Sequence, residues 1–243
     1  MSDPIQRRGA LTIIPIYGMP ECHAGDELAV QIHDAAAVNA TPLQSGDCLV
    51  VTQKVVSKVE NRLVALDPND IAAKHALVEA ESVRIVRQRG DLIIAETRHG
   101  WICANAGIDL SNVAPGTAAL LPIDSDRSAR HIRDALRARF DVDCAVIISD
   151  TFGRPWRHGL TDVAIGVCGI AAVLDLRDTP DALGRTLHVT EVAIGDEVAS
   201  AAELVMGKAD GVPVAIVRGL DPSWFRESSS RELVRPAADD LFR

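Results

Sequence analysis

Aromatic residues are scarce in this chain, in which Phe, Trp and Tyr make up only 3% of the 243 residues. The stacked rings on which single-stranded nucleic acids bind are therefore hard to assemble. The chain also lacks a basic excess, because it has 34 acidic against 25 basic side chains and a formal net charge of -9. A nucleic-acid partner would favour a basic face, so we expect none. The core must be built from Val, Ile, Leu and Ala.

Long hydrophobic runs and paired cysteines are missing too. No apolar stretch approaches the roughly 20 residues of a membrane helix, and residues 1–8 carry charges with no apolar run after them. We therefore expect neither a membrane partner nor a secretory signal. The cysteines lack the short spacings of metal sites and are expected to be reduced core thiols, which favours a cytoplasmic protein; they are Cys22, Cys48, Cys103, Cys144 and Cys168.

Short apolar runs and helical spacings follow one another without a regular strand–helix alternation. We expect strands near 11–16, 48–52, 91–96, 101–105, 144–148 and 212–218, with further strands and turns over 163–194. We expect helices near 26–38, 71–87, 127–140 and 196–206. This mixture predicts an α+β fold of mixed sheets with packed helices. No stretch is typical of a linker, so residues 1–243 should form one domain, at most divided into two intimately packed subdomains.

Two aspartates follow predicted strands, and they are the first candidates for chemistry. Asp150 and Thr151 come after an apolar strand, and Asp109 comes shortly after another. Mg²⁺ prefers one or two carboxylates with water and phosphate oxygens, so the two aspartates could share a metal. An Asp that only caps a turn explains each position equally well. The motifs GxSxG, HExxH, CxxC and GxGxxG are absent.

Basic residues supply a second group of candidates. Lys54 and Lys58 are four residues apart and would share a helical face able to receive a polyphosphate, although a solvated helix face is the simpler alternative. Gly207-Lys208 does not fit a phosphate loop, because Ala202 and Ala209 break the spacing, and Gly207 is most simply a helix C-cap.

Four segments, in order along nearly the whole chain, together resemble the coenzyme F420-0:L-glutamate ligase family. They are VVTQKVVSKVENR (50–62), CANAGIDLSN (103–112), ISDTFGRPWRHGLTDVAIG (148–166) and LVMGKADGVPVAIVRG (204–219). The resemblance implies a homodimeric ligase that adds L-glutamate, and then a second γ-linked glutamate, to coenzyme F420-0 or its dehydro precursor. It also implies GTP as co-substrate, two Mg²⁺ or Mn²⁺ ions, and K⁺. The reductase-like domain that some members carry at the C-terminal end is not expected.

The resemblance also assigns residues. Metal-binding positions fall on Asp109, Asp150 and Thr151, and guanine-nucleotide positions on Met19, Pro20, Glu21, Cys22, Gln53, Lys58, Asn112, Met206, Gly207 and Lys208. Lys208 stands where some members carry an acidic or amide residue for the second metal. A protonated lysine cannot ligate a metal, so either the second ion is not kept in this chain or other groups hold it.

The resulting hypothesis is an amide-forming ligase that works through an acyl phosphate. Asp150 is the expected catalytic carboxylate, and Arg154 and Arg157 are expected to bind phosphate or carboxylate groups of the substrate. Two alternatives stay open. One is a metal-dependent phosphohydrolase that uses the same aspartates, and the other is a regulatory module that binds GTP without catalysis.

Overall fold

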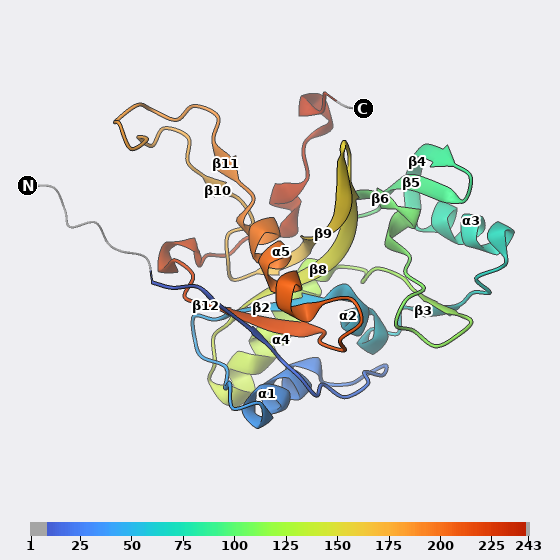
Figure 1. Ribbon diagram of the computed structural model, residues 1–243, viewed down its shortest axis with the longest axis horizontal. Helices are drawn as coiled ribbons and strands as arrows, with labels where there is room; N and C mark the ends of the chain where they lie inside the picture. Colours follow the sequence, from blue (N-terminus) through green and yellow to red (C-terminus); the bar gives the residue numbers. More distant parts are fainter. Residues whose placement is uncertain (1–8, 242–243) are drawn as a thin grey trace, which may run out of the picture.

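A five-stranded sheet forms the centre of the protein, of which the computed structural model describes residues 9–241 (Figure 1). Its strand order is β1-β12-β2-β8-β9, and only the neighbours β2 and β8 run parallel. The strands are β1 (Thr12–Pro15), β12 (Val214–Arg218), β2 (Cys48–Thr52), β8 (Ala145–Arg154) and β9 (Arg157–Cys168). The expectation of no secretory signal concerns residues 1–8, which lie outside the described residues.

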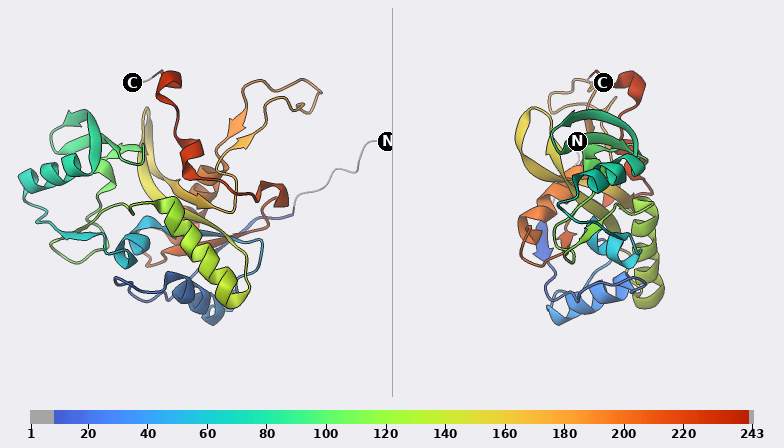
Figure 2. Two further views of the ribbon diagram at one scale, coloured as in Figure 1. Left: turned by 180° about the vertical axis from the view of Figure 1, so that it is seen from behind. Right: turned by 90° about the vertical axis from the view of Figure 1, so that its right-hand side faces the viewer.

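Helices cover both faces of this sheet. Helices α1 (Leu28–Val38) and α4 (Ser125–Phe140) pack on one face, and α5 (Ile194–Met206) packs on the other (Figure 2). This double cover explains why β2 and the first half of β8 are uninterrupted apolar runs rather than alternating ones. Gly207 ends α5 with φ 60°, which confirms it as the C-cap of that helix.

Smaller elements lie beside the central sheet. Two short sheets contain β3 (Leu63–Ala65) with β7 (Thr117–Ala119) and β10 (Leu174–Asp175) with β11 (Glu191–Val192). A three-stranded sheet contains β4 (Ser82–Arg89), β5 (Leu92–Thr97) and β6 (Ile102–Ala104). The remaining α-helices are α2 (Gln53–Val59) and α3 (Ile71–Ala80), and the 3-10 turns are η1 (Asn105–Gly107), η2 (Pro222–Trp224), η3 (Ser230–Leu233) and η4 (Ala237–Asp239).

Two sequence-based predictions are wrong in their extent. The helix predicted over 71–87 ends at Ala80, because the β-branched Val83, Ile85 and Val86 belong to β4, which pairs with β5. The strand predicted over 144–148 continues to Arg154, so Asp150 lies inside β8 rather than after it. The outer halves of β8 and β9 form an antiparallel arm that projects from the sheet (Figure 1).

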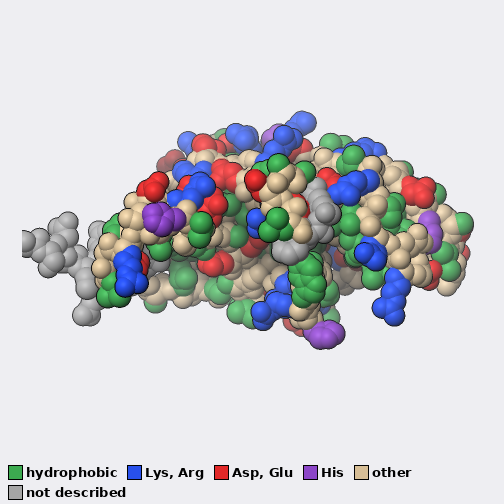
Figure 3. Space-filling model, turned by 90° about the horizontal axis from the view of Figure 1, so that it is seen from above, with side chains coloured by type: hydrophobic (Ala, Val, Ile, Leu, Met, Phe, Trp, Pro, Cys, Tyr) green, Lys and Arg blue, Asp and Glu red, His purple; other side chains and the backbone are tan. Residues whose placement is uncertain are grey.

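The structure also bears on the expected fold class, the state of the cysteines, membrane-spanning helices and the surface charge. The mixed α+β architecture is confirmed, with helices packed on a largely antiparallel sheet. All five cysteines are free and buried, as predicted. No described helix is long and apolar enough to cross a membrane. Acidic, basic and hydrophobic side chains are interspersed over the described part of the face in Figure 3, and that view has no continuous basic surface.

Candidate active site

A cavity of about 870 Å³ opens beside the carboxyl end of β2, at the base of the β8–β9 arm. Segments from all four matched motifs line it, together with the loop before α1. The structure thus brings together every predicted metal and nucleotide residue: Met19, Pro20, Glu21, Cys22, Gln53, Lys58, Asp109, Asn112, Asp150, Thr151, Met206, Gly207 and Lys208. These side chains come from distant parts of the sequence, and only the fold makes them neighbours.

Asp150 lies on β8 just beyond an irregularity in the pairing of β8 with β9. The register shifts between Ile148 and Ser149, where β9 has one extra residue, and beyond it Asp150 lies opposite Val163 and Thr151 opposite Asp162. Such bulges redirect side chains and are frequent beside active sites. Ser149 and Thr151 both donate hydrogen bonds to Asp162, at 3.0 and 2.6 Å. Because alternate residues of a strand face opposite sides, Asp150 points away from Asp162.

Asp109 is presented by a left-handed turn that follows β6. Asn105, Ala106 and Gly107 have φ values of 50, 54 and 73° in succession, although Ala106 is not a glycine and is buried. Strain of this kind persists where the surrounding structure holds it, often at functional sites. A side chain at position 107 would meet Leu121 at 2.7 Å, so the turn fits tightly against its neighbour.

The two aspartates among the predicted metal-binding residues have opposite electrostatic surroundings. Burial alone would raise the pKa of Asp109, but the Lys54 ammonium, 2.7 Å away, and the Ser111 N–H bind the carboxylate and lower its pKa. Burial, together with the nearby carboxylates of Asp109 and Asp162, raises the pKa of Asp150 to about 7, although a hydrogen bond from the Thr151 N–H acts in the opposite direction. The site therefore favours a proton or another cation at Asp150.

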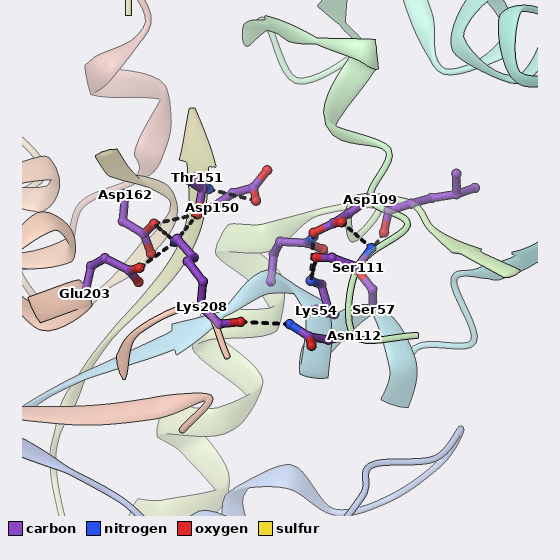
Figure 4. A network of polar contacts seen from close by, with 12 residues as sticks. Lys54, Ser57, Asp109, Ser111, Asn112, Asp150, Thr151, Asp162, Glu203 and Lys208 are labelled. Atoms are coloured by element: carbon purple, nitrogen blue, oxygen red, sulfur yellow. Dashed lines mark hydrogen bonds and ion pairs between the residues drawn. The ribbon is translucent and has the colours of Figure 1, made fainter. Parts of the chain in front are cut away.

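Lys208 organises the opposite wall of the cavity, where Figure 4 shows its ammonium pointing toward two carboxylates. The Nζ atom lies 2.9 Å from Asp162 Oδ1 and 2.6 Å from Glu203 Oε1, and it also contacts Thr151 Oγ1. Burial would lower the pKa of Lys208, but hydrogen bonds to Glu203 and Asp162 outweigh it and raise the pKa. Lys208 is therefore a fixed positive charge.

The third basic group lies near the loop that precedes α1. Lys58 forms an ion pair with Glu21, and both residues line the cavity. Lys54 and Lys58 both belong to α2 and face the cavity, so the solvated-face alternative does not hold for either. Gln53, only 1% exposed, holds its Nε2 donor without a hydrogen-bond acceptor in the described structure. A buried, unpaired donor in a cavity wall indicates a ligand that supplies an acceptor.

The carboxylates at Asp109 and Asp150 fit a hard divalent cation. No group of three or more His, Cys, Asp or Glu side chains among residues 9–241 is arranged to hold a metal by itself. Mg²⁺ is commonly held by one or two carboxylates, with water and substrate phosphates completing its coordination. Asp150 also lacks an ion pair with a lysine or arginine of the described chain, so its charge remains to be neutralised. The fit is to an ion held by these two carboxylates, with water or phosphate oxygens completing its coordination.

Arg154 and Arg157 do not join this constellation. Both lie at the exposed end of the β8–β9 arm, where Arg154 Nη2 donates to the His158 carbonyl oxygen at 2.9 Å, and neither lines the cavity. Their proposed contact with substrate stays a prediction. Sequence reasoning missed Asp162 and Glu203, which bind Lys208. Asp162 lies within the motif at 148–166, and this was its only sequence signal.

Comparison with known proteins connects this geometry to a family. The profile of the F420-0:Gamma-glutamyl ligase family matches residues 18–219. A protein of Methanothermobacter thermautotrophicus named coenzyme F420:L-glutamate ligase is 43% identical, over 96% of this chain and 99% of its own length. Proteins of the same name from Methanopyrus kandleri and Methanocaldococcus jannaschii are 44% and 39% identical, over 96% and 88% of this chain and 98% and 91% of their own lengths.

Proposed function

The chain belongs to the F420-0:gamma-glutamyl ligase family, and we propose that it joins L-glutamate to coenzyme F420-0 or its dehydro precursor with GTP as co-substrate. One observation supports this best: a single cavity gathers three lysines and an acidic cluster from four matched motifs. Lysines suit the phosphates of a nucleotide, and carboxylates suit the cation that accompanies them. A second, γ-linked glutamate could follow at the same site.

We propose that the reaction proceeds through an acyl phosphate. The acceptor's carboxylate oxygen attacks the γ-phosphorus of GTP, and the bond to the β-γ bridging oxygen breaks, releasing GDP. The amine of glutamate then attacks the acyl carbonyl carbon, phosphate leaves with the electron pair of the C–O bond, and the amine's proton passes to phosphate or solvent. Both transfers depend mainly on positioning and on neutralising phosphate charge.

The residues of the cavity would have different roles in this reaction. Asp109 and Asp150, with Thr151 beside them, would hold Mg²⁺ or Mn²⁺, which when bound draws negative charge from the phosphates. Lys58, now paired with Glu21, is placed to bind a nucleotide phosphate in its stead. Lys54, now paired with Asp109, is placed to bind a phosphate once a cation binds Asp109. Gln53 offers its free Nε2 donor to the nucleotide. Met206 and Gly207 line the same cavity as Met19 to Cys22.

The proposal includes three finer points. The family resemblance implies a K⁺ requirement and a homodimer, and the absence of a linker implies that any division of the chain is into two packed subdomains. Trp156 is 80% exposed on the arm and Leu160 is 68% exposed, which is compatible with burial of the arm by another chain. Light scattering on the purified protein measures the dimer directly, and activity with and without K⁺ measures the salt requirement.

Mass spectrometry of the products tests the central proposal. The protein is incubated with GTP, Mn²⁺, L-glutamate and coenzyme F420-0, and we expect the acceptor to gain one or more glutamyl residues as GDP and phosphate appear. Rapid GTP hydrolysis that needs neither glutamate nor acceptor would instead identify a phosphohydrolase. GTP binding without phosphate release under any acceptor condition would identify a regulatory module.

A further inference from the structure

The position of the Lys208 ammonium resembles that of a bound cation. Three oxygen atoms from three different elements surround it: Asp162 Oδ1 on β9, Glu203 Oε1 on α5 and Thr151 Oγ1 on β8. Asp162 is nearly fully buried and Glu203 is largely buried. Two carboxylates this close to one another in a buried place repel unless a positive charge lies between them. The lysine side chain itself is 54% exposed, so only its charged end occupies this position.

The net charge of the residues that line the cavity independently indicates how many divalent ions the cavity suits. Its described lining residues include five carboxylates and three ammonium groups: Glu21, Asp109, Asp150, Asp162 and Glu203, against Lys54, Lys58 and Lys208. The acids exceed the bases by two charges, which is the charge of one Mg²⁺ or Mn²⁺ ion. A second divalent ion would leave the wall with an excess of positive charge before any phosphate arrives.

The surroundings of Asp162 also leave a second ion no place beside Lys208. Its Oδ1 atom receives the Thr151 hydroxyl at 2.6 Å and the Lys208 ammonium at 2.9 Å, while Oδ2 receives the Ser149 hydroxyl at 3.0 Å. The Asn112 side chain donates to the Lys208 carbonyl oxygen at 3.2 Å and so holds the lysine's backbone against the facing wall. An ion could bind Asp162 and Glu203 only after the ammonium had left.

We propose that Lys208 is the second cation of this active site, so that the protein binds one divalent ion, at Asp109 and Asp150, where comparable phosphate chemistry often uses two. The ammonium replaces the other ion between Asp162, Glu203 and Thr151. The inference deepens the proposed function and takes from it the identity of the first ion as Mg²⁺ or Mn²⁺. That the cavity receives a ligand at all has separate support in the buried, unpaired Nε2 donor of Gln53.

A built-in cation has consequences that a second metal would not have. It cannot be removed by a chelator, and it is covalently tied to the loop that follows α5. Lys208 is thereby a positioning residue, which fixes Asp162, Glu203 and Thr151 relative to one another rather than touching the reacting atoms. Replacing it by an uncharged side chain should uncover two carboxylates and a hydroxyl, a donor set that suits Mn²⁺.

Counting bound Mn²⁺ tests the proposal without any catalytic turnover. The purified full-length protein is stripped with a chelator and titrated with Mn²⁺ alone at pH 8, and free Mn²⁺ is followed by electron paramagnetic resonance. We expect one bound ion per wild-type chain and two in Lys208→Gln, with water completing the coordination of each ion. Lys208→Arg, which keeps the charge, should bind one. Lys74→Gln is the matched control, because Lys74 lies on α3 away from the cavity, and it should also bind one.

Each outcome of the ion count either supports the proposal for Lys208 or overturns it. Two ions, or none, in the wild-type chain would overturn the proposal, and this count needs no variant to fold. One ion in a folded Lys208→Gln variant, verified by a thermal melt, would overturn it as well. Failure of the proposed ligase activity is separate: a chain that adds no glutamate but shows the expected counts would refute the function and leave the assignment of Lys208 standing.

Discussion

The side-chain amide of Asn112 donates a hydrogen bond to the backbone carbonyl oxygen of Lys208, 3.2 Å away and 96 residues further along the chain. This contact joins the loop that carries Asp109 to the loop that follows α5, and so it connects two walls of the cavity (Figure 4). Asn112 itself has φ 52°, a left-handed conformation that asparagine tolerates better than most residues. Both the side chain and the backbone of Asn112 therefore favour this residue type.

Asn112→Ala should loosen the cavity more than the fold. We expect the KM for GTP to rise about 3- to 10-fold, because one hydrogen bond contributes about 0.5–1.5 kcal/mol. Steady-state kinetics at varied GTP measures the change. Asn69→Ala, in an exposed loop outside the cavity, is the control and should leave the KM unaltered. An unchanged KM in Asn112→Ala would show that the contact does not shape the nucleotide site.

Asp150→Asn should abolish metal-dependent turnover of GTP while the protein stays folded. Asparagine keeps the size of the side chain but removes the charge that holds the cation. We expect the rate to fall by at least about 10³-fold, in line with the loss of an electrostatic group aimed at a developing charge. Circular dichroism confirms the fold, and GDP release measures the rate. Near-wild-type turnover would remove Asp150 from the mechanism.

The metal-free protein should lose stability as the pH rises from about 4 to 7. The pKa of Asp150 is raised to about 7 in the folded chain, so between these values the folded state holds a proton that the unfolded state has already released. Asp150→Asn should flatten this part of the profile and stabilise the metal-free protein above pH 7 by roughly 1–3 kcal/mol. Urea unfolding at several pH values, in the presence of a chelator, measures both effects. A wild-type profile that rises over this interval would contradict the assignment.

Lys58→Ala should weaken GTP binding by about 10-fold or more, because it removes a nearly buried ammonium from the cavity wall. Arg157→Ala is the variant with which the Kd of Lys58→Ala for GTP is compared. Arg157 belongs to the matched motif at 148–166 but lies outside the cavity, so its loss should change the Kd of GTP less than about twofold. Isothermal titration calorimetry gives both constants. A stronger effect at Arg157 would mean that the arm reaches a nucleotide.

Gly107→Ala should destabilise the protein by about 2–4 kcal/mol, since a methyl group there would meet Leu121 at 2.7 Å and the residue has φ 73°. Gly90→Ala separates the two causes. Gly90 has φ 58° but open space around it, so this variant reports the backbone strain alone, which is about 1 kcal/mol. Thermal melts provide the comparison. Equal losses in the two variants would exclude the steric contribution.

The sequence predicts much of the central sheet, because the signals are local. The apolar run of β2 and the helical spacing of α5 are each readable within a dozen residues. The region from Ile71 to Arg89 is harder, because one apolar pattern is shared by a helix and a strand. The pairing of β4 with β5 decides where the helix ends and the strand begins, and no short window of sequence contains this tertiary contact.

The residues of the site, too, can be predicted from sequence only where the signal is local. Asp109 and Asp150 could be chosen from sequence as candidates because each follows an apolar run. Asp162 and Glu203 could not, since their role arises from the register of β8 against β9 and from the end of α5. Arg157 shows that closeness in sequence does not place a residue in the same cavity: a strand advances about 3.3 Å per residue, so Arg157 lies further out along the arm than Asp150.

The arm also determines where this protein can change in length. The contacts of Asp150 and Thr151 depend on their pairing with Val163 and Asp162, and one residue inserted between them and the sheet would turn each side chain to the other face. A change at the turn between Arg154 and Arg157 leaves those pairs intact. The register that places Asp150 and Thr151 therefore tolerates a change of length at the tip but not in the stretch a few residues before it.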